Sequence, residues 1–534
     1  MIQRLKKVLL SIQLFSALVI MLPLYGYQVQ PANAVIDSCI NHKGMEFLWV
    51  FPRQSGKDET IAQVSAFLLT LFHRLEACIV HVYPTTQQIT VGSARLERRL
   101  DNNITAGRWW TKTKPLRRGF GQAVVAFFSG HPQAKSEGAT ANLLLIINET
   151  QDQHEPTIDR RFTPMRASTN ATALYVGTVR TTHDLLWKIK TRLERLQQQD
   201  GTQRVFFVTP DQVGKENSHY AAFVANQIET KGRQHPSVKT ELFNEPLDAT
   251  AGLFPPRRLA LMQGTHRRQL EPIPGETYVI TIDLGGQDEA AQGTATWRSP
   301  APPAAAGGAD GGELDNPDRD YTVATVAQVI RNATPTGHTY NVIDVFTDHG
   351  SRHFQRSPGP SGESPGQPSL FDRLLAYIDH WKPLAIVCDA SGVGQGITDA
   401  LINACSNQVI GFDFAKSYGK ARLGNAFLAL VETGRLKYFK EADDTDAWWF
   451  FTQAEHCTYE LSEGIPIERG LRWHVPPQAT ITLPNGETVL IHDDRLLSAA
   501  LLAETDRLAK AGDVFLGSSE SAVIERPTQE DTAW

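Results

Sequence analysis

Residues 45–72, "MEFLWVFPRQSGKDETIAQVSAFLLTLF", predict a strand, a tight turn and a helix in immediate succession. The apolar start is typical of a buried strand, and apolar residues recur at roughly helical spacing after the turn. The turn, "FPRQSGKDET" at 51–60, approximates the pattern G-x-x-x-x-G-K-[ST], whose backbone N–H groups cradle phosphates and whose Lys reaches the outer oxygens. Gly56 and Lys57 match that pattern. A strand, such a loop and a helix form the setting that a phosphate-binding loop requires.

The loop departs from the usual pattern at two positions. Phe51 stands in place of the first Gly and Asp58 in place of the Ser or Thr that holds Mg²⁺. A second apolar strand at 143–147 ends in Asn148-Glu149, where ATPases of this type have Asp-Glu: the Asp holds the Mg²⁺ shell and the Glu polarises the attacking water. A polar turn and a solvated loop carboxylate are the alternatives for each motif alone. Together they predict a nucleotide site.

Size and composition narrow the class of protein. At 534 residues the chain is longer than one hydrophobic core usually serves, so at least two domains are expected. A net charge of -6 argues against a wholly basic nucleic-acid binder, so DNA contacts would come from local patches. The five Cys lack C-x-x-C spacing, which disfavours a zinc site and a disulfide framework and favours a reducing compartment.

The N-terminus imitates a secretory signal. It has a basic start, an apolar run over 8–25 and Ala-Asn-Ala at 32–34. The competing interpretation is a buried helix that leads into the first strand, because Pro23 and Gln28 interrupt the apolar run before it reaches membrane-spanning length.

The second half has a different pattern of elements. Strands are expected at 277–286, 320–330 and 339–348, followed by a helix, a strand at 383–389, further helix and strand segments, and a final helix at 491–508. That order suits the ribonuclease H fold. Two low-apolar stretches, 298–318 and 356–369, are expected to be loops, and the polar tail at 513–534 is expected to be flexible.

Carboxylates mark the ends of these elements. In a ribonuclease H fold they converge on two divalent metals, because hard cations about 4 Å apart need oxygen ligands to activate water and stabilise the leaving oxygen. The predicted catalytic ligands are Asp283, Asp389 and Asp494, with Asp493 as a fourth or alternative ligand and Asp320 ranked below them. Each alone could be a turn former or a helix N-terminal carboxylate. Mg²⁺ is expected as the metal, with Mn²⁺ as an alternative.

The order of these segments resembles the large terminase subunits of tailed bacteriophages. The resemblance covers most of the chain and is carried by "YGYQVQPANAVIDS", "PRQSGKDE", "HVYPTTQQ", "FFSGHPQAKSEGATANLLLIINETQDQ", "LYVGTV", "DASGVGQG" and "HDDRLLSAAL". It implies an α/β chain with a P-loop (RecA-like) ATPase domain at 1–265 and a ribonuclease H-like nuclease domain at 266–512. Because "YGYQVQPANA" belongs to the pattern, the signal-like N-terminus is interpreted as a mimic.

The resemblance also implies roles for individual residues. ATP with Mg²⁺ would be bound by an adenine-contacting segment, the phosphate loop and a coupling motif, that is, by Gln28, Arg53, Gln54, Ser55, Gly56, Lys57, Asp58, Gly177 and Thr178. Arg53 would stabilise transferred charge, and Glu149 would polarise the attacking water. The expected partners are double-stranded DNA, a small terminase subunit and a portal protein that carries a ring of large subunits, in the host cytoplasm and without a membrane.

Basic stretches supply candidate DNA contacts. Lys416, Lys420 and Arg422 follow the expected fifth strand of the second half, and 112–119 and 265–269 are further candidates. A solvated charged face is the alternative for any one of them.

Besides a secreted or membrane-anchored protein, which the signal-like N-terminus would suggest, two rival functions remain at this stage. One is a recombinase or nuclease of the ribonuclease H fold, which would not need the ATPase half. The other is a prophage remnant whose ATPase has decayed, which Asp58 and Asn148 favour. Against the second, a carboxylate at Asp58 is expected to coordinate Mg²⁺ and to replace part of the charge missing at Asn148.

Overall fold

The computed structural model describes most of the chain. The described residues are 8–134, 139–247, 252–285, 320–334, 337–349, 351, 353–355, 368–405, 408–416, 418–441, 443–462, 465–483 and 486–511. The stretch at 298–318, most of 356–369 and the tail at 513–534 lie outside them. The chain divides into two compact units: unit 1 is Met1–Ile228, Arg233–Ala249 and Glu463–Pro466, and unit 2 is Glu229–Gly232, Thr250–Ser462 and Ile467–Trp534.

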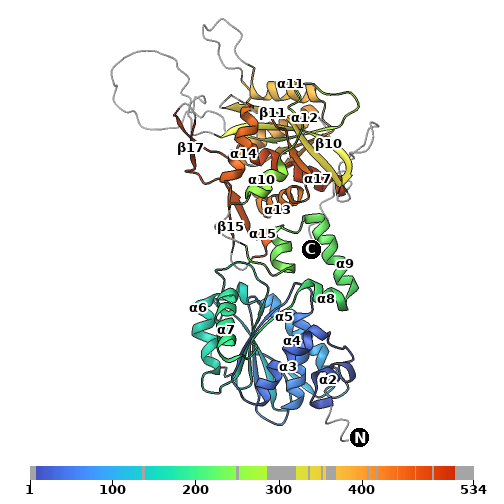
Figure 1. The fold of residues 1–534 in the computed structure, drawn as a ribbon, viewed down its shortest axis with the longest axis vertical. Coiled ribbons are helices and arrows are strands. Elements are labelled where there is room, and N and C mark those ends of the chain that lie inside the picture. The colour runs from blue at the N-terminus through green and yellow to red at the C-terminus, as the bar shows by residue number, and fades with distance from the viewer. Residues whose placement is uncertain are drawn as a thin grey trace, which may run out of the picture. The chain divides into compact units, whose positions relative to one another are not determined.

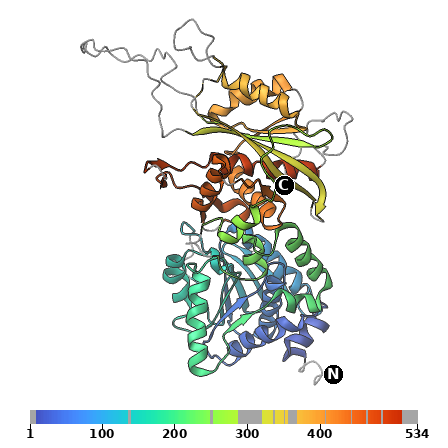
Figure 2. The ribbon, with the colours of Figure 1, turned by 45° about the horizontal axis from the view of Figure 1, so that its top comes forward.

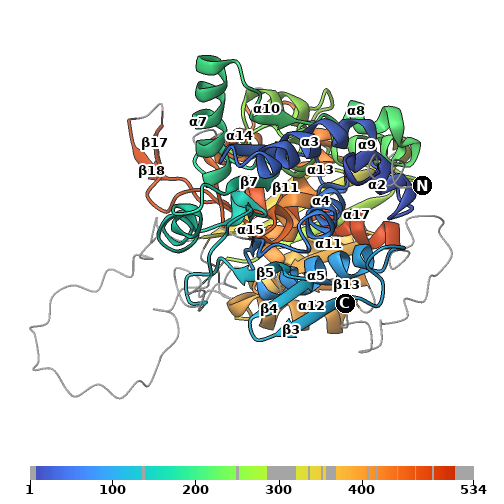
Figure 3. The same ribbon diagram turned by 90° about the horizontal axis from the view of Figure 1, so that it is seen from below.

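Unit 1 is built on one eight-stranded sheet of order β3-β4-β5-β2-β6-β7-β1-β8. The strands are β1 (Glu46–Val50), β2 (Cys78–Tyr83), β3 (Trp109–Thr113), β4 (Leu116–Phe120), β5 (Ala123–Ser129), β6 (Leu144–Ile147), β7 (Thr172–Gly177) and β8 (Val205–Phe207). Neighbours from β5 to β8 pair parallel, whereas β3 and β4 form an antiparallel edge next to β5, as Figure 3 shows. The parallel strands are buried on both faces, which explains their continuous apolar runs.

Helices cover both faces of this sheet. Helix α7 (Leu185–Asp200) and the short α6 (Glu155–Thr157) lie on one face, and α3 (Gly26–Ile40), α4 (Lys57–Leu71) and α5 (Thr86–Leu100) lie on the other (Figure 1). Helices α2 (Ile12–Leu18), α8 (Pro210–Glu216) and α9 (Ser218–Lys231) also belong to this half of the chain. One strand, β7, separates β1, which precedes the phosphate loop, from β6, which is followed directly by Asn148. This order confirms the predicted P-loop, RecA-like arrangement.

The signal-like N-terminal segment belongs to the core of unit 1. Phe15 on α2 packs edge-to-face on Phe67 of α4, with ring centroids 5.2 Å apart. Val35 on α3 is fully buried. Among the described residues, none of the helices is long and apolar enough to cross a membrane.

Unit 2 is built on a six-stranded sheet of order β13-β12-β9-β10-β11-β14. The strands are β9 (Tyr278–Asp283), β10 (Tyr321–Thr334), β11 (Gly337–His349), β12 (Ala385–Asp389), β13 (Val409–Phe412) and β14 (Leu436–Tyr438). Strands β9, β10 and β11 pair antiparallel, and β12 pairs parallel with β9 and β13. This order confirms the predicted ribonuclease H-like arrangement.

Helices of unit 2 lie on both sides of that sheet. Figure 2 shows α11 (Leu370–Trp381) and α12 (Gln395–Cys405), in light orange, on one face, with the darker orange to red helices that follow them in the chain on the other. The latter include α13 (Gly419–Glu432), α14 (Thr445–His456), α16 (Asp494–Ala500) and α17 (Leu502–Ala511). The final helix predicted within 491–508 begins at Asp493 and Asp494 as expected, but it divides at Leu501 into α16 and α17, so the prediction of a single helix is wrong.

Two further pieces of unit 2 matter for the site. Helix α10 (Pro256–Met262) packs on α13 and β14, so residues just before 265 belong to the second compact unit. The predicted boundary between the ATPase domain and the nuclease domain, at residue 265, stays a prediction. A short helix α15 (Ile467–Gly470) joins β15 (Thr458–Leu461) to β16 (Leu471–His474), which form an antiparallel hairpin.

Candidate functional site

The phosphate loop turns between β1 and α4 because Gly56 adopts a left-handed conformation, φ 85°. Gln28 on α3 fixes the loop by hydrogen bonds to its backbone. Its Nε2 donates to the carbonyls of Ser55 at 3.3 Å and Gly56 at 3.4 Å. A Cβ at position 56 would come within 2.6 Å of that Nε2, so the close approach needs a glycine. In this arrangement Gln28 supports the loop, and its adenine contact stays a prediction.

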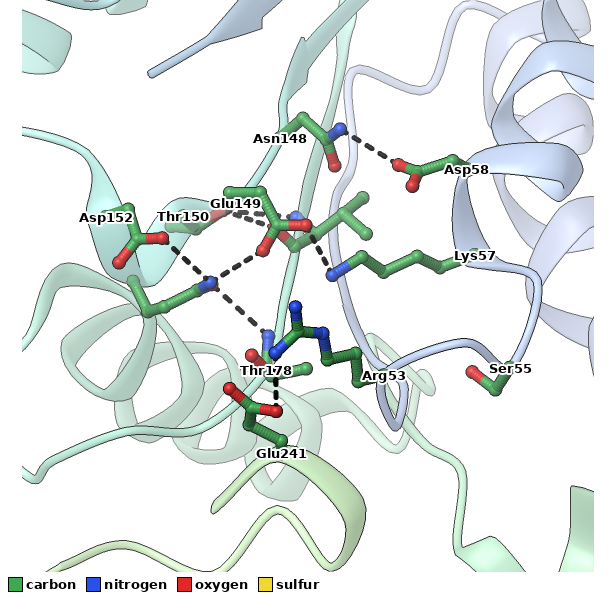
Figure 4. A network of polar contacts seen from close by, with 12 residues as sticks. Arg53, Ser55, Lys57, Asp58, Asn148, Glu149, Thr150, Asp152, Thr178 and Glu241 are labelled. Atoms are coloured by element: carbon green, nitrogen blue, oxygen red, sulfur yellow. Dashed lines mark hydrogen bonds and ion pairs between the residues drawn. The ribbon is translucent and has the colours of Figure 1, made fainter. Parts of the chain in front are cut away.

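Lys57, the first residue of α4, meets Glu149, which follows the end of β6. Figure 4 shows Lys57 Nζ directed at Glu149 Oε1, 2.6 Å away. Burial lowers the pKa of Lys57, but the charges of Glu149 and Asp58 outweigh burial and raise that pKa above its ordinary value. Glu149 itself has φ 46°, a left-handed conformation that is uncommon outside glycine and recurs at functional sites.

Asp58 and Asn148 contact each other directly. Asn148 Nδ2 donates to Asp58 Oδ1 at 3.0 Å, and Arg95 Nη1 on α5 lies 3.2 Å from Asp58 Oδ2. Burial raises the pKa of Asp58, but Lys57, the Asn148 hydrogen bond and Arg95 lower it below its ordinary value, so the carboxylate is ionised. The two unusual residues thus form one pair. The carboxylate sits on the helix and the neutral side chain at the strand end, the reverse of the usual arrangement.

A chain of hydrogen bonds joins the Glu149 carboxylate to the predicted coupling motif. Gln151 Nε2 donates to Glu149 Oε2 at 2.6 Å, and Gln151 Oε1 accepts from the backbone N–H of Thr178 at 3.2 Å (Figure 4). A Cβ at Gly177 would lie 2.1 Å from Gln151 Oε1, so only glycine leaves room for this contact. The sequence analysis missed Gln151, because nothing in the local pattern distinguishes it from other loop glutamines.

Arg53 is held at the edge of the loop by Glu241. Its Nη1 lies 2.7 Å from Glu241 Oε2, and its backbone N–H donates to the Glu241 carbonyl at 2.7 Å. About half of the Arg53 side chain is exposed, at 52%. Sequence reasoning did not connect these two residues, which lie 188 positions apart.

Two buried titratable groups near the loop were also missed. Burial raises the pKa of Asp152 to about 6, although Arg180 lies 3.0 Å away and opposes that rise. Burial lowers the pKa of His81, on β2, to about 3. His81 lies in the sheet interior with its ring 4.3 Å from that of Tyr83, so it is a neutral core residue at neutral pH.

The second candidate site lies in unit 2. Asp283 ends β9, Asp389 ends β12 and Asp494 begins α16, and all three are at least nine-tenths buried. Burial raises the pKa of Asp283 well above its ordinary value, and Asp494, Asp389 and Asp493 raise it further. Asp283 thus lies within electrostatic reach of the other three predicted carboxylates, and we call these four residues the carboxylate cluster.

Neighbouring groups fix these carboxylates in different ways. Burial raises the pKa of Asp494 to about 7, and its Oδ2 accepts the N–H of Tyr321 at 3.0 Å. Burial also raises the pKa of Asp389, whose Oδ1 accepts the N–H of Ser391. Lys420 Nζ lies 3.4 Å from Asp493 Oδ2.

The metal-binding geometry is incomplete in this structure. Asp320 pairs with His492 at 3.0 Å, at the exposed side of the cluster. Within the residues that the structure describes, no three Asp, Glu, His or Cys side chains are grouped closely enough to hold a metal ion. Carboxylate oxygens are suitable ligands for a hard divalent cation. In this structure, however, the side chains are not directed at one common metal position.

Two of the candidate DNA-contacting stretches contain residues with structural roles. Arg268 lies within 2.7–3.1 Å of Asp344, Asp444 and Asp446. Arg118 is buried and donates to Glu97 at 2.5 Å. These two arginines stabilise the fold, which the charge pattern alone could not distinguish from a binding surface.

Comparisons with known proteins point to one kind of structure. No family model matches the sequence, and no curated protein matches it. The chain is similar in structure to the large terminase of a thermophilic bacteriophage, with 12% identity, a TM-score of 0.43, and coverage of 90% of this chain and 99% of that one. It is also similar to the HK97 bacteriophage large terminase, with 12% identity, a TM-score of 0.35 and coverage of 91% and 96%. The large terminase nuclease of the thermophilic phage G20c, solved with bound magnesium, covers 48% of this chain at 14% identity, with a TM-score of 0.30 and 98% of that chain matched. At such identities and TM-scores, function must be argued from the residues of this chain.

Proposed function

We propose that this chain is the large subunit of a phage terminase, which hydrolyses ATP to move DNA into a capsid and cuts that DNA with a metal-dependent nuclease. The observation that carries the proposal is the presence of two sites in one chain. The Lys57–Glu149 pair lies at the strand ends of a RecA-like sheet, and a buried carboxylate cluster lies at the strand ends of a ribonuclease H-like sheet. Double-stranded DNA, a small subunit, a portal and a ring of copies are the partners of this proposal.

In the ATPase half, each side chain has a separate task. The loop N–H groups and Lys57 bind the phosphates, and Arg53 leaves Glu241 to stabilise the transferred charge. Glu149 Oε1, freed from Lys57, accepts a hydrogen bond from the attacking water and orients it. When bound, Mg²⁺ would neutralise phosphate charge. Asp58 and the buried Asn148 Oδ1, which has no hydrogen-bond partner among the described residues, would hold it.

In the nuclease half, Asp283, Asp389 and Asp494 would hold the divalent metals, which supply an activated water and stabilise the leaving oxygen of a phosphodiester. The buried carboxylates repel one another, and this repulsion favours a cation at the site. Side-chain rotation would have to bring the oxygens together. Lys420, beside Asp493, is placed to bind a neighbouring backbone phosphate.

Two assays on the same preparations test the proposal. DNA cleavage with Mg²⁺ or Mn²⁺ should require Asp389, and Asp389→Ala should abolish it while ATP hydrolysis continues. Lys57→Ala should abolish ATP hydrolysis while cleavage continues. Asp399→Ala is a suitable control, since this Asp on α12 is outside both sites. Cleavage that persists in Asp389→Ala would reject the nuclease assignment.

One alternative function has a specific observation in its favour. The exchanged Asp58–Asn148 pair is compatible with a phosphate loop that no longer hydrolyses ATP. A metal-dependent nuclease without any ATP hydrolysis in well-folded protein would support a prophage remnant or another ribonuclease H-fold nuclease over a packaging motor.

A further inference from the structure

A cavity beside the carboxylate cluster of unit 2 has features of a nucleotide-binding pocket. Its volume is about 390 Å³, within the range of small-ligand pockets. It opens between the start of α13 and the β15–β16 hairpin, and Tyr418, Lys420, Arg469, Arg472, Trp473 and His474 line it. We call it the hairpin pocket. The sequence analysis singled out Lys420 but none of the residues from the hairpin.

The hairpin pocket is positively charged. Three of the described residues that line it are Lys or Arg, and none is Asp or Glu. Arg469 and Arg472 are exposed, and neither forms an ion pair with another described residue. Lys420 contacts both the pocket and the carboxylate cluster. Its Nζ is 5.5 Å from the ring centroid of Trp473 and 3.4 Å from Asp493 Oδ2. The charge therefore attracts a phosphate to a place directly beside the carboxylates.

An aromatic side chain stands at the mouth of this pocket. Tyr418 is 53% exposed, and the Arg469 guanidinium lies 5.9 Å from its ring centroid. Tyr418 has φ 65°, a left-handed conformation that a bulky residue rarely adopts, so the fold holds this ring outward at a cost. Trp473, by contrast, is buried, and its Nε1 donates to the Lys420 carbonyl, so it forms the floor.

We infer that the hairpin pocket binds one unpaired nucleotide of a DNA strand, with the base stacked on Tyr418 and the phosphate held by Lys420, Arg469 and Arg472. Base-on-aromatic stacking tolerates any sequence because every base has a π face, and the basic groups follow the backbone. This inference rests on the proposal that unit 2 cuts DNA. It adds that the strand next to the cut is unpaired and held out of the duplex.

Binding can be measured apart from cleavage. The full chain with Asp389→Ala, in buffer with EDTA, is titrated into a fluorescent short duplex with blunt ends and into the same duplex with a single-stranded overhang. We expect tighter binding to the overhang, and Tyr418→Ala should lower that affinity about tenfold without changing the blunt-end affinity. Tyr418→Asn, which suits the left-handed backbone, should behave like Tyr418→Ala, and Tyr418→Phe should behave like the parent.

Charge and control variants complete the design. The double variant Arg469→Gln with Arg472→Gln should bind the overhang more weakly. The slope of log affinity against log salt concentration should become less steep by about 1.4, the value for two single-strand phosphate contacts. Trp448→Ala removes an exposed aromatic that lines a different cavity and should change neither affinity. Circular dichroism confirms that each variant is folded.

The outcomes separate the pocket from the nuclease. Overhang binding that Tyr418→Ala and Tyr418→Asn leave unchanged would overturn the pocket, even if the parent chain cuts DNA in an Asp389-dependent way. A Tyr418-dependent overhang preference in a chain that never cuts DNA would support the pocket and reject the nuclease.

Discussion

The exchange of the carboxylate between positions 148 and 58 can be tested by reversing it. Asp58→Ser alone removes the carboxylate that now accepts from Asn148 Nδ2 at 3.0 Å and faces Arg95. A hydrogen bond to a charged group contributes about 1.5–3 kcal/mol. If the charge acts in the transition state, its loss should lower kcat for ATP hydrolysis about 10- to 150-fold.

The second single variant should also be impaired. Asn148→Asp places another carboxylate against Asp58, where a 3.0 Å hydrogen bond now stands, and like charges at that distance cannot both stay ionised without penalty. The double variant, Asp58→Ser with Asn148→Asp, restores the usual arrangement. It should recover most of the wild-type kcat, with a coupling free energy of about 1–3 kcal/mol between the two positions.

The coupling free energy comes from a double-mutant cycle: steady-state ATP hydrolysis is measured for the wild type, the two single variants and the double variant, and ATP affinity is measured separately. Glu59→Gln is the matched control, since Glu59 lies on the same turn of α4 and pairs with Arg99 of α5 at 3.0 Å, much as Asp58 pairs with Arg95. It should change kcat little. Two results would refute the idea that the Asp58 carboxylate replaces the one missing at position 148. One is an additive loss of kcat in the double variant, and the other is normal turnover in Asp58→Ser.

Three further predictions concern other groups. Gln151→Ala should lower kcat for ATP hydrolysis about tenfold with unchanged ATP affinity, because it breaks the link from Glu149 to Thr178; an unchanged kcat would contradict this. In EDTA, the contribution of Asp494 to the free energy of unfolding should fall as pH rises from 3.8 to about 7, because burial raises the pKa of Asp494 and the folded state keeps a proton that the unfolded chain has released. In urea titrations, the free energy of unfolding of Asp494→Asn relative to wild type should therefore increase as pH rises from about 4 to about 7, and a pH-independent difference would be evidence against that assignment. Burial lowers the pKa of His81 from 6.5 to about 3, so the contribution of His81 to stability is full above pH 6.5 and declines below it; His81→Phe should remove a loss of about 2 kcal/mol between pH 7 and pH 5.

The sequence by itself determined much of the fold. A strand, loop and helix around Lys57 and apolar strands that end in Glu149, Asp283 and Asp389 are local patterns. Parallel strands end at one edge of a sheet, so residues at their ends converge whatever the connections between them. The predicted fold class is confirmed, whereas the order of the strands in each sheet comes from the structure. The roles of the individual site residues stay predictions.

Only the tertiary structure decided which side chains meet. The pairing of Asp58 with Arg95, of Arg53 with Glu241 and of Gln151 with Thr178 joins different elements, and no periodicity encodes such contacts. The same holds for the arginines: ion pairs with distant carboxylates made Arg268 of the basic stretch at 265–269 structural, while Arg469 of α15, which lies in none of the predicted basic stretches, lies beside Tyr418. Local patterns fix where a strand ends, but the packing of distant segments fixes what that end touches, and charge and hydrogen bonding act through those contacts.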